Sequence, residues 1–206
     1  MLELFERGGI MMYPLALASL TALALMIERA FALRKKKIII PEILAVVKNF
    51  STLKDIDLAK SMCEKYDSPF SNIVKLSLDY HVLSKGELRE VIEDNGRQEA
   101  RKLEKGLVAL ETIAAISPLM GLLGTVIGMV RVFEVIKDQG IGQTAALSGG
   151  ISEALLTTVS GLFVGIPVLI AYYYFSSKSE DLILDIEKYS NQLIQKISLI
   201  KSSPNK

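Results

Sequence analysis

The feature that most constrains this chain is an uncharged apolar stretch near its carboxyl end. From Ala154 to Ser177 the sequence contains no charged residue, and Glu153 directly precedes this stretch. A helix needs roughly 20 predominantly apolar residues to cross the hydrocarbon core of a bilayer. The stretch from Gly150 to Phe175 is therefore predicted to span a membrane as a helix.

Glu153 falls where this predicted span has already begun. An ionised carboxylate in a bilayer costs about 3 kcal/mol or more, and such residues commonly face a bundle interior or serve a proton relay. The alternative is that the span begins after Glu153, which then lies among the lipid headgroups. Helical spacing places five residues of this span on one face, which we interpret as the lining of a narrow aqueous pore. These residues are Gly149, Glu153, Thr157, Ser160 and Val164. The opposite side suits contact with lipid or with an apolar neighbour and carries Leu155, Leu162, Ile166 and Leu169.

Two further uncharged stretches predict two further spans. Gly8 to Ile27 is one, and Thr112 to Val130 is the other. Small residues in the second stretch recur on one helical face, and Pro118 is expected to kink it. Small side chains at this spacing let two helix backbones approach closely, so this face predicts tight helix packing or a pore lining. The residues on this face are Ser117, Gly121, Gly124 and Gly128.

Charge is concentrated between the apolar blocks. About half of the 206 residues are hydrophobic, and the formal net charge is +1. The basic residues from Arg34 to Lys37 follow the first predicted span and should stay in the cytoplasm. This places the amino terminus in the periplasm and, after three spans, the carboxyl terminus in the cytoplasm.

The intervening sequence predicts short soluble helices. Their expected starts are Pro41, Asp55, Ser68-Pro69 and Ser84, where Ser84 and Glu87 form a capping box. We expect the helix from Ser84 to run unbroken into the second span, and residues 131–146 to form a short polar turn. Residues 178–200 repeat apolar positions at helical spacing and predict a cytoplasmic helix.

Several classes of function find no support in the sequence. Cys63 is the single cysteine and His81 the single histidine, so neither an internal disulfide nor a cysteine-based metal cluster is expected. The neutral overall charge gives no case for nucleic acid binding. We find no paired carboxylates, nucleophile motif or phosphate-binding loop, so we predict neither an enzyme nor a cofactor.

Two of the apolar blocks resemble a known family. ISPLMGLLGTVIGMV and GISEALLTTVSGLFVGIPVLIAYYYF look like the second and third spans of the ExbB/TolQ proton-channel family, which is related more distantly to the MotA flagellar stators. The first span, the span order and the large first cytoplasmic loop are similar as well. Three spans rather than four favour the ExbB/TolQ branch.

The resemblance implies a function and its partners. Such proteins form a pentameric ring around the membrane helices of a small ExbD-like or TolR-like protein. They couple the proton-motive force to work on a TonB-like or TolA-like protein that spans the periplasm. By resemblance, Glu153 matches the essential third-span glutamate, Thr125 the threonine of GLLGTV, and Thr158 the threonine five positions after the glutamate. These three residues are the expected proton pathway.

Some positions depart from the family pattern. Ile127 stands where relatives often have tryptophan, Arg131 where a small polar residue is usual, and Thr157 and Ser160 where relatives are apolar. These departures leave proton and sodium both open as the coupling ion. Thr158 also lies about 140° around the helix from Glu153, so it should face the second span or a neighbouring subunit.

The sequence thus predicts an all-α membrane protein of the bacterial inner membrane. The expected parts are 1–33 (periplasmic amino terminus and first span), 34–105 (cytoplasmic helical domain), 106–136 (second span), 137–146 (periplasmic turn), 147–177 (third span) and 178–206 (cytoplasmic helix and tail). The leading function is a proton-conducting motor subunit. The alternatives are a scaffold that anchors a partner complex without conducting ions, and a sodium-driven or specialised motor of the same family.

Overall fold

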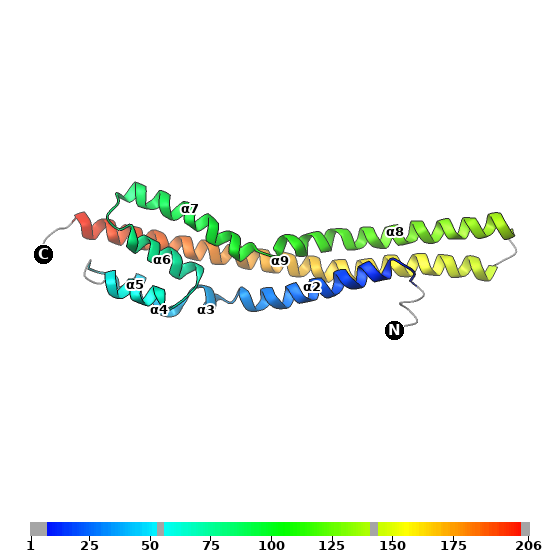
Figure 1. The fold of residues 1–206 in the computed structure, drawn as a ribbon, viewed down its shortest axis with the longest axis horizontal. Helices are drawn as coiled ribbons and strands as arrows, with labels where there is room; N and C mark the ends of the chain where they lie inside the picture. Colours follow the sequence, from blue (N-terminus) through cyan, green and yellow to red (C-terminus); the bar gives the residue numbers. More distant parts are fainter. Residues whose placement is uncertain (1–7, 53–55, 141–143, 203–206) are drawn as a thin grey trace. The chain divides into compact units, whose positions relative to one another are not determined.

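A computed structural model describes residues 8–52, 56–140 and 144–202 of the chain. These residues form helices and no strand, so the predicted all-α fold is confirmed. Three helices are long and apolar enough to cross a membrane: α2 (Met12–Ala32), α8 (Leu107–Gln139) and α9 (Thr144–Ser202). The three predicted membrane-spanning helices are therefore present (Figure 1).

The chain divides into two compact units. The first, which we call the span unit, comprises Met1–Arg29 and Gly106–Tyr174. The second, which we call the cluster unit, comprises Ala30–Lys105 and Phe175–Lys206. Helix α9 contributes to both units, because it runs without interruption from Thr144 to Ser202.

In the span unit, α8 and α9 form an antiparallel hairpin (Figure 1). Their backbones meet where small residues face one another. A Cβ placed on Gly161 would lie 2.6 Å from the backbone oxygen of Ser117 and 3.0 Å from the Cα of Gly121. A Cβ on Gly165 would lie 2.9 Å from the ring of Pro118. The close approach that the sequence predicts for α8 is thus observed, and it requires glycine on both helices.

Helix α2 belongs to the same unit and buries only a narrow stripe. Leu15, Ala22 and Arg29 are its buried residues, spaced seven apart along one face. Large apolar side chains cover the rest of α2, including Leu17 and Leu20, each about two-thirds exposed. An apolar surface of this kind suits contact with lipid or with another helix.

The described residues of the cluster unit form five further helices besides the end of α9. They are α3 (Lys35–Ile38), α4 (Pro41–Asn49), α5 (Ile56–Glu64), α6 (Pro69–Asp79) and α7 (Lys85–Glu104). Their apolar faces pack into a conventional core, in which Phe70 is fully buried and meets the ring of Tyr189 edge-on at 5.9 Å between centroids. The predicted amphipathic helices therefore do form a packed helical unit.

Local chemistry fixes the starts of these helices. The Ser68 hydroxyl accepts a hydrogen bond from the backbone of Ser71, and Pro69 follows in the first turn. Ser84 and Glu87 bond reciprocally, so the predicted capping box is confirmed. The same bond lowers the pKa of the Glu87 carboxyl, because the charged form accepts the hydrogen bonds of Ser84.

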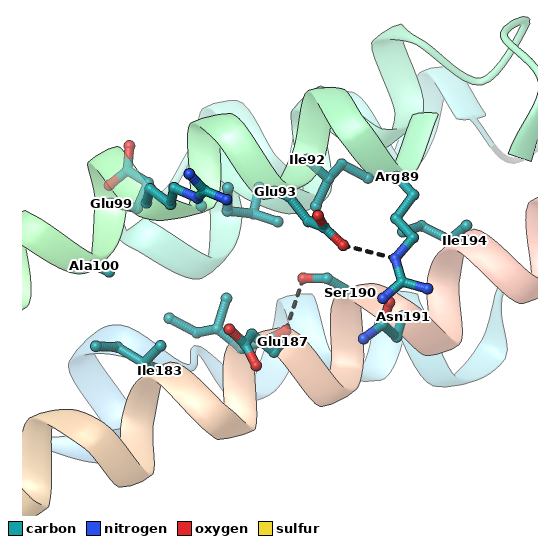
Figure 2. A pocket seen from close by; sticks show the side chains of 14 residues that line it. Arg89, Ile92, Glu93, Glu99, Ala100, Ile183, Glu187, Ser190, Asn191 and Ile194 are labelled. Atoms are coloured by element: carbon teal, nitrogen blue, oxygen red, sulfur yellow. Dashed lines mark hydrogen bonds and ion pairs between the residues drawn. The ribbon is translucent and has the colours of Figure 1, made fainter. Parts of the chain in front are cut away.

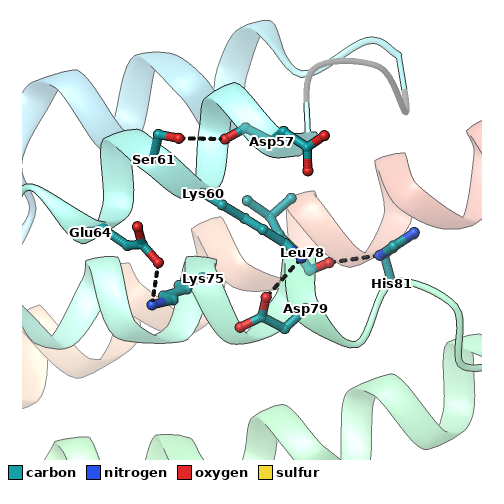
Figure 3. A network of polar contacts seen from close by, with 8 residues as sticks. All are labelled: Asp57, Lys60, Ser61, Glu64, Lys75, Leu78, Asp79 and His81. Atoms are coloured by element: carbon teal, nitrogen blue, oxygen red, sulfur yellow. Dashed lines mark hydrogen bonds and ion pairs between the residues drawn. The ribbon is translucent and has the colours of Figure 1, made fainter.

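Ion pairs tie α5 to α6 across the surface of the cluster unit (Figure 3). Lys60 pairs with Asp79 and Lys75 with Glu64, each at 2.8 Å. His81, which follows α6, bonds through Nδ1 to the backbone oxygen of Leu78 at 2.7 Å. These exposed pairs orient neighbouring helices and contribute little to stability individually.

Two expected features of the helix boundaries are wrong. Helix α7 does not run unbroken into α8: it ends at Glu104, and Gly106 adopts a left-handed conformation with φ of 82° before α8 begins. Glycine adopts this conformation readily, which makes it a natural helix terminator. The expected polar turn at 131–146 is also mostly helical, because α8 continues to Gln139 and α9 starts at Thr144; residues 141–143 lie outside the described residues.

Candidate functional site

Glu153 lies near the start of α9 and marks the candidate site. It is the one carboxylate on the helix between its start and the end of the uncharged stretch at Ser177. Its side chain is about one-quarter exposed, at 23%. A carboxylate in this setting can accept and release a proton, and it can also hold a cation.

Arg131 of α8 pairs with this carboxylate. Its Nη1 donates to Glu153 Oε1 at 2.8 Å, and the arginine side chain is 51% exposed. Both residues lie at the same end of the hairpin, where the uncharged stretches of α8 and α9 stop. The pair therefore stands at the boundary of the apolar region rather than in its middle, which matches the alternative placement of Glu153 near the headgroups as well as a site at a pore entrance.

The segment before α2 also contacts the Glu153 carboxylate, through Gly9. Gly9 has a φ of 69°, and a Cβ placed there would overlap Glu153 Oε1 and lie 2.8 Å from the carboxyl carbon Cδ. Glu153, which belongs to α9, is thus in contact with α8 and with the segment that precedes α2. Arg131 and Gly9 are site residues whose role the sequence did not reveal.

Thr125 and Thr158 do not bond to the Glu153 carboxylate within one chain. The Thr125 hydroxyl donates to the backbone oxygen of Leu122 at 2.7 Å. The Thr158 hydroxyl donates across the hairpin to the backbone oxygen of Gly121 at 3.2 Å. The prediction that Thr158 faces the second span or a neighbouring subunit agrees with this bond. Thr158 therefore joins α8 to α9, while Thr125 remains partly exposed on α8.

The polar residues proposed to line a pore are mostly packing residues in this chain. Ser117 and Thr157 are buried. Thr157 packs directly on Gly124: a Cβ placed on Gly124 would lie 2.5 Å from Cγ2 of Thr157. Thr157 and Ser160 donate their hydroxyls to backbone oxygens one turn earlier, at Glu153 and Leu156. A hydroxyl that bonds within its own helix is satisfied without water.

The face predicted for α9 is rotated by about one residue from the face that meets α8. Of the predicted set, Thr157 is buried, Glu153, Ser160 and Val164 are partly exposed, and Gly149 is exposed. The observed contact residues on α9 are chosen by small size rather than by polarity: Gly150, Ala154, Thr157, Gly161 and Gly165. On α8, Gly121, Gly124 and Gly128 do meet α9 as expected. The spacing of glycine and alanine along α9 could have revealed this face.

The cluster unit holds a hollow of about 420 Å³ between α6, α7 and α9 (Figure 2). Isoleucines from α6, α7 and α9 line it, and Arg89 pairs with Glu93 at 2.7 Å beside it. Among the described residues, no group of three His, Cys, Asp or Glu side chains could hold a metal ion. The Oε2 atom of Glu99, which also lines the hollow, is buried without a hydrogen-bond partner among the described residues. Because the rest of the wall is largely apolar, the hollow resembles an imperfectly filled core more than a reaction site.

Comparison with known proteins places these helices in a family. The model of the MotA/TolQ/ExbB proton channel family matches residues 65–188. An ExbB homologue of Methanothermobacter thermautotrophicus is 30% identical over 205 residues, which cover 99% of this chain and 69% of the relative. An ExbB-like protein of Synechocystis sp. is 34% identical over 180 residues, or 82% of each chain. The biopolymer transport protein ExbB of Neisseria gonorrhoeae is 35% identical over 102 residues, or 50% of this chain. With the three spanning helices and the matched region in agreement, the chain belongs to the MotA/TolQ/ExbB proton channel family.

Proposed function

We propose that this chain is a proton-conducting subunit that couples the proton-motive force to work on a partner. The observation that carries the proposal is the position of Glu153: one carboxylate at the end of an uncharged span, in contact with Arg131 of α8 and with Gly9 before α2. Intramembrane carboxylates of this kind commonly serve proton relays. Family membership supports the same general role in energy transduction.

The proposed driving force is the electrochemical gradient across the membrane. Moving one charge through the full potential yields about 2.3 kcal/mol per 100 mV. Glu153 would take a proton from one side and release it to the other as its surroundings change. The cycle needs no covalent intermediate and no cofactor.

The proposed setting is a homo-oligomer, a pentamer by family resemblance, in the inner membrane. The exposed apolar side chains of α2, α8 and α9 supply surface for lipid and for neighbouring subunits. A small ExbD-like or TolR-like protein is the proposed partner, with a TonB-like or TolA-like protein receiving the work. The hairpin end near Asp138 would face the periplasm and Ser202 the cytoplasm, so a cysteine replacing Asp138 should react with an impermeant reagent added outside, and one replacing Ser202 should not.

One observation favours a second function, that of a scaffold. The ion pair between Arg131 and Glu153 is also what a static structural link between α8 and α9 would look like. In that case Glu153 would anchor the hairpin and carry no ion. The two functions differ in what happens when the charge is removed but the shape of the side chain is kept.

The substitution Glu153→Gln tests the proposal. Proton flux should be measured in vesicles that contain the purified complex, together with the coupled process. We expect assembly to be retained and both flux and coupled work to be lost. Glu134→Gln is the matched control, because Glu134 is an exposed carboxylate on α8 and its replacement should leave both activities intact. Full coupled activity in Glu153→Gln would remove the carrier role and leave the scaffold.

A further inference from the structure

The Glu153 carboxylate is held from two sides. Arg131 Nη1 donates to Oε1 at 2.8 Å from α8. The same oxygen is the atom that a Cβ on Gly9 would overlap, so the backbone before α2 stands directly against it. Oε1 therefore sits between a guanidinium on one element and a glycine backbone on another.

Within the described part of the chain, no hydroxyl group donates to this carboxylate. Thr157 donates to the backbone oxygen of Glu153 and not to its side chain. Thr125 and Thr158 donate to backbone oxygens of α8. Among the residues that the structure describes, Arg131 is the cation within ion-pair distance of Glu153.

An ion pair persists only while both partners are charged. The guanidinium of Arg131 remains protonated at any physiological pH, so only Glu153 can change its charge. A proton taken up by the carboxylate removes the charge that holds the arginine. Protonation of Glu153 and release of Arg131 are thus linked events.

We propose that Arg131 is a positioning residue that latches the channel closed at rest, by holding the ionised Glu153 against Gly9. This inference rests on the proposed role of Glu153 as the proton carrier. When the latch opens, a proton from water on one side forms an O–H bond with the carboxylate, and Arg131 keeps its own protons and separates. The carboxylic acid later returns the proton to water on the other side, and the ion pair forms again.

Passive proton flux through vesicles containing the purified complex tests the latch. In Arg131→Gln the carboxylate is free at rest, and we expect passive flux to rise roughly fivefold, the ratio that corresponds to losing about 1 kcal/mol of a partly exposed ion pair. Arg131→Lys keeps the charge and should restore most of the low flux. The double variant Arg131→Gln with Glu153→Gln should show only background flux, because it lacks the carrier.

The outcomes separate the latch from the proposed function. If Glu153→Gln abolishes flux but Arg131→Gln leaves passive flux at the wild-type level, the latch is wrong and the carrier role stands. If flux is unaffected by Glu153→Gln, the carrier role fails and the latch fails with it. An equal rise in Arg131→Gln and Arg131→Lys would also contradict the latch, because the charge would then be irrelevant.

Gly9 supplies a second test that leaves both charges in place. An alanine at residue 9 would collide with the carboxylate, whose flexible end must give way, so Gly9→Ala should raise passive flux in the same direction as Arg131→Gln. Gly140→Ala is the matched control: Gly140 also has a positive φ, 76° against 69°, but a Cβ there meets nothing within 4 Å. Equal flux in the two alanine variants would show that backbone strain, and not displacement of Glu153, is responsible, and would overturn the latch.

Discussion

The two units of this chain are built on opposite plans. In the cluster unit, large apolar side chains such as Phe70 and Leu193 are fully buried, and charged side chains cover the surface. In the span unit, glycine and threonine occupy the contact between α8 and α9, while Phe163 and Leu155 are 78% and 62% exposed. Large apolar side chains are thus buried in the core of the cluster unit, whereas many of them are exposed on the surface of the span unit.

The difference follows from the solvent that each unit meets. In water, burial of apolar surface is the main force that assembles helices. In a bilayer, lipid is as apolar as leucine, so helix contacts depend on close packing of small residues and on hydrogen bonds between helices. The hydroxyl of Thr158 bonded to the backbone of Gly121 is one such link. A substitution should therefore be judged by the unit in which it falls.

The largest contrast should come from two phenylalanines. Phe70→Ala in the cluster unit removes a fully buried ring and should destabilise that unit by about 3–5 kcal/mol. Phe163→Ala in the span unit removes a ring that is 78% exposed and should change the stability of the chain little. Thermal or denaturant unfolding of the detergent-solubilised protein would measure both. A large loss for Phe163→Ala alone would point to a subunit contact at that position.

Two glycines of α9 test whether close backbone packing stabilises the span unit. In Gly161→Ala the new Cβ would lie 2.6 Å from the backbone oxygen of Ser117, which cannot move aside cheaply, so we expect a loss of about 1–3 kcal/mol. Gly149→Ala meets nothing within 4 Å and should be neutral or slightly stabilising, because alanine favours helix. Resistance to denaturation and recovery of the oligomer are the readouts. Equal tolerance at both positions would break the close-packing argument.

A helix cap in the cluster unit should have a smaller effect. Ser84→Ala removes the hydroxyl that accepts the hydrogen bond of the Glu87 backbone at the start of α7, while the backbone N–H of residue 84 can still donate to the Glu87 carboxylate, and should cost about 1 kcal/mol. Ser61→Ala is the control, because the Ser61 hydroxyl only bonds to the backbone oxygen of Asp57 within α5. The midpoint of denaturant unfolding compares them. A larger loss for Ser61→Ala would show that the cap does not define the start of α7.

The smallest predicted effect concerns Cys63. Burial in the cluster unit raises the pKa of its thiol from 9.0 to about 11, so the thiol stays protonated and unreactive near neutral pH. Labelling with a thiol reagent at neutral pH should be slow in the folded protein and fast after unfolding. Because the pKa of the thiol is higher in the folded protein, ionisation of Cys63 favours the unfolded protein. The contribution of the protonated thiol to the free energy of unfolding is therefore complete below pH 9 and is lost as the pH rises towards 11. Rapid labelling of the folded protein would contradict the burial.

Local features were predictable from the sequence because their causes are local. Pro41, Ser68 and Ser84 mark helix starts through chemistry that acts within four residues, and the spans follow from the length of uncharged sequence. The break at Gly106 was missed because one glycine in an otherwise helical pattern does not reveal its φ. It becomes a terminator only where the chain needs a left-handed residue.

The site was predicted in part for the same reason. Glu153 stands out by its charge in apolar sequence, and its role as proton carrier stays a prediction. The Arg131 partner depends on the register of the hairpin, and the approach of Gly9 depends on the path of the chain before α2; neither is a property of nearby sequence. The pore-lining face of α9 was inferred from polar residues and stays a prediction, whereas small size decides which residues touch α8.

The most direct test of the account is the protonation state of Glu153 itself. Infrared difference spectroscopy of the purified complex in membranes can detect the carbonyl band of a protonated carboxylic acid and its shift in heavy water. We predict a band that appears when a proton gradient drives the complex and is absent in Glu153→Gln. A carboxylate that stays ionised throughout the driven cycle, with wild-type flux, would contradict the claim that Glu153 carries the proton.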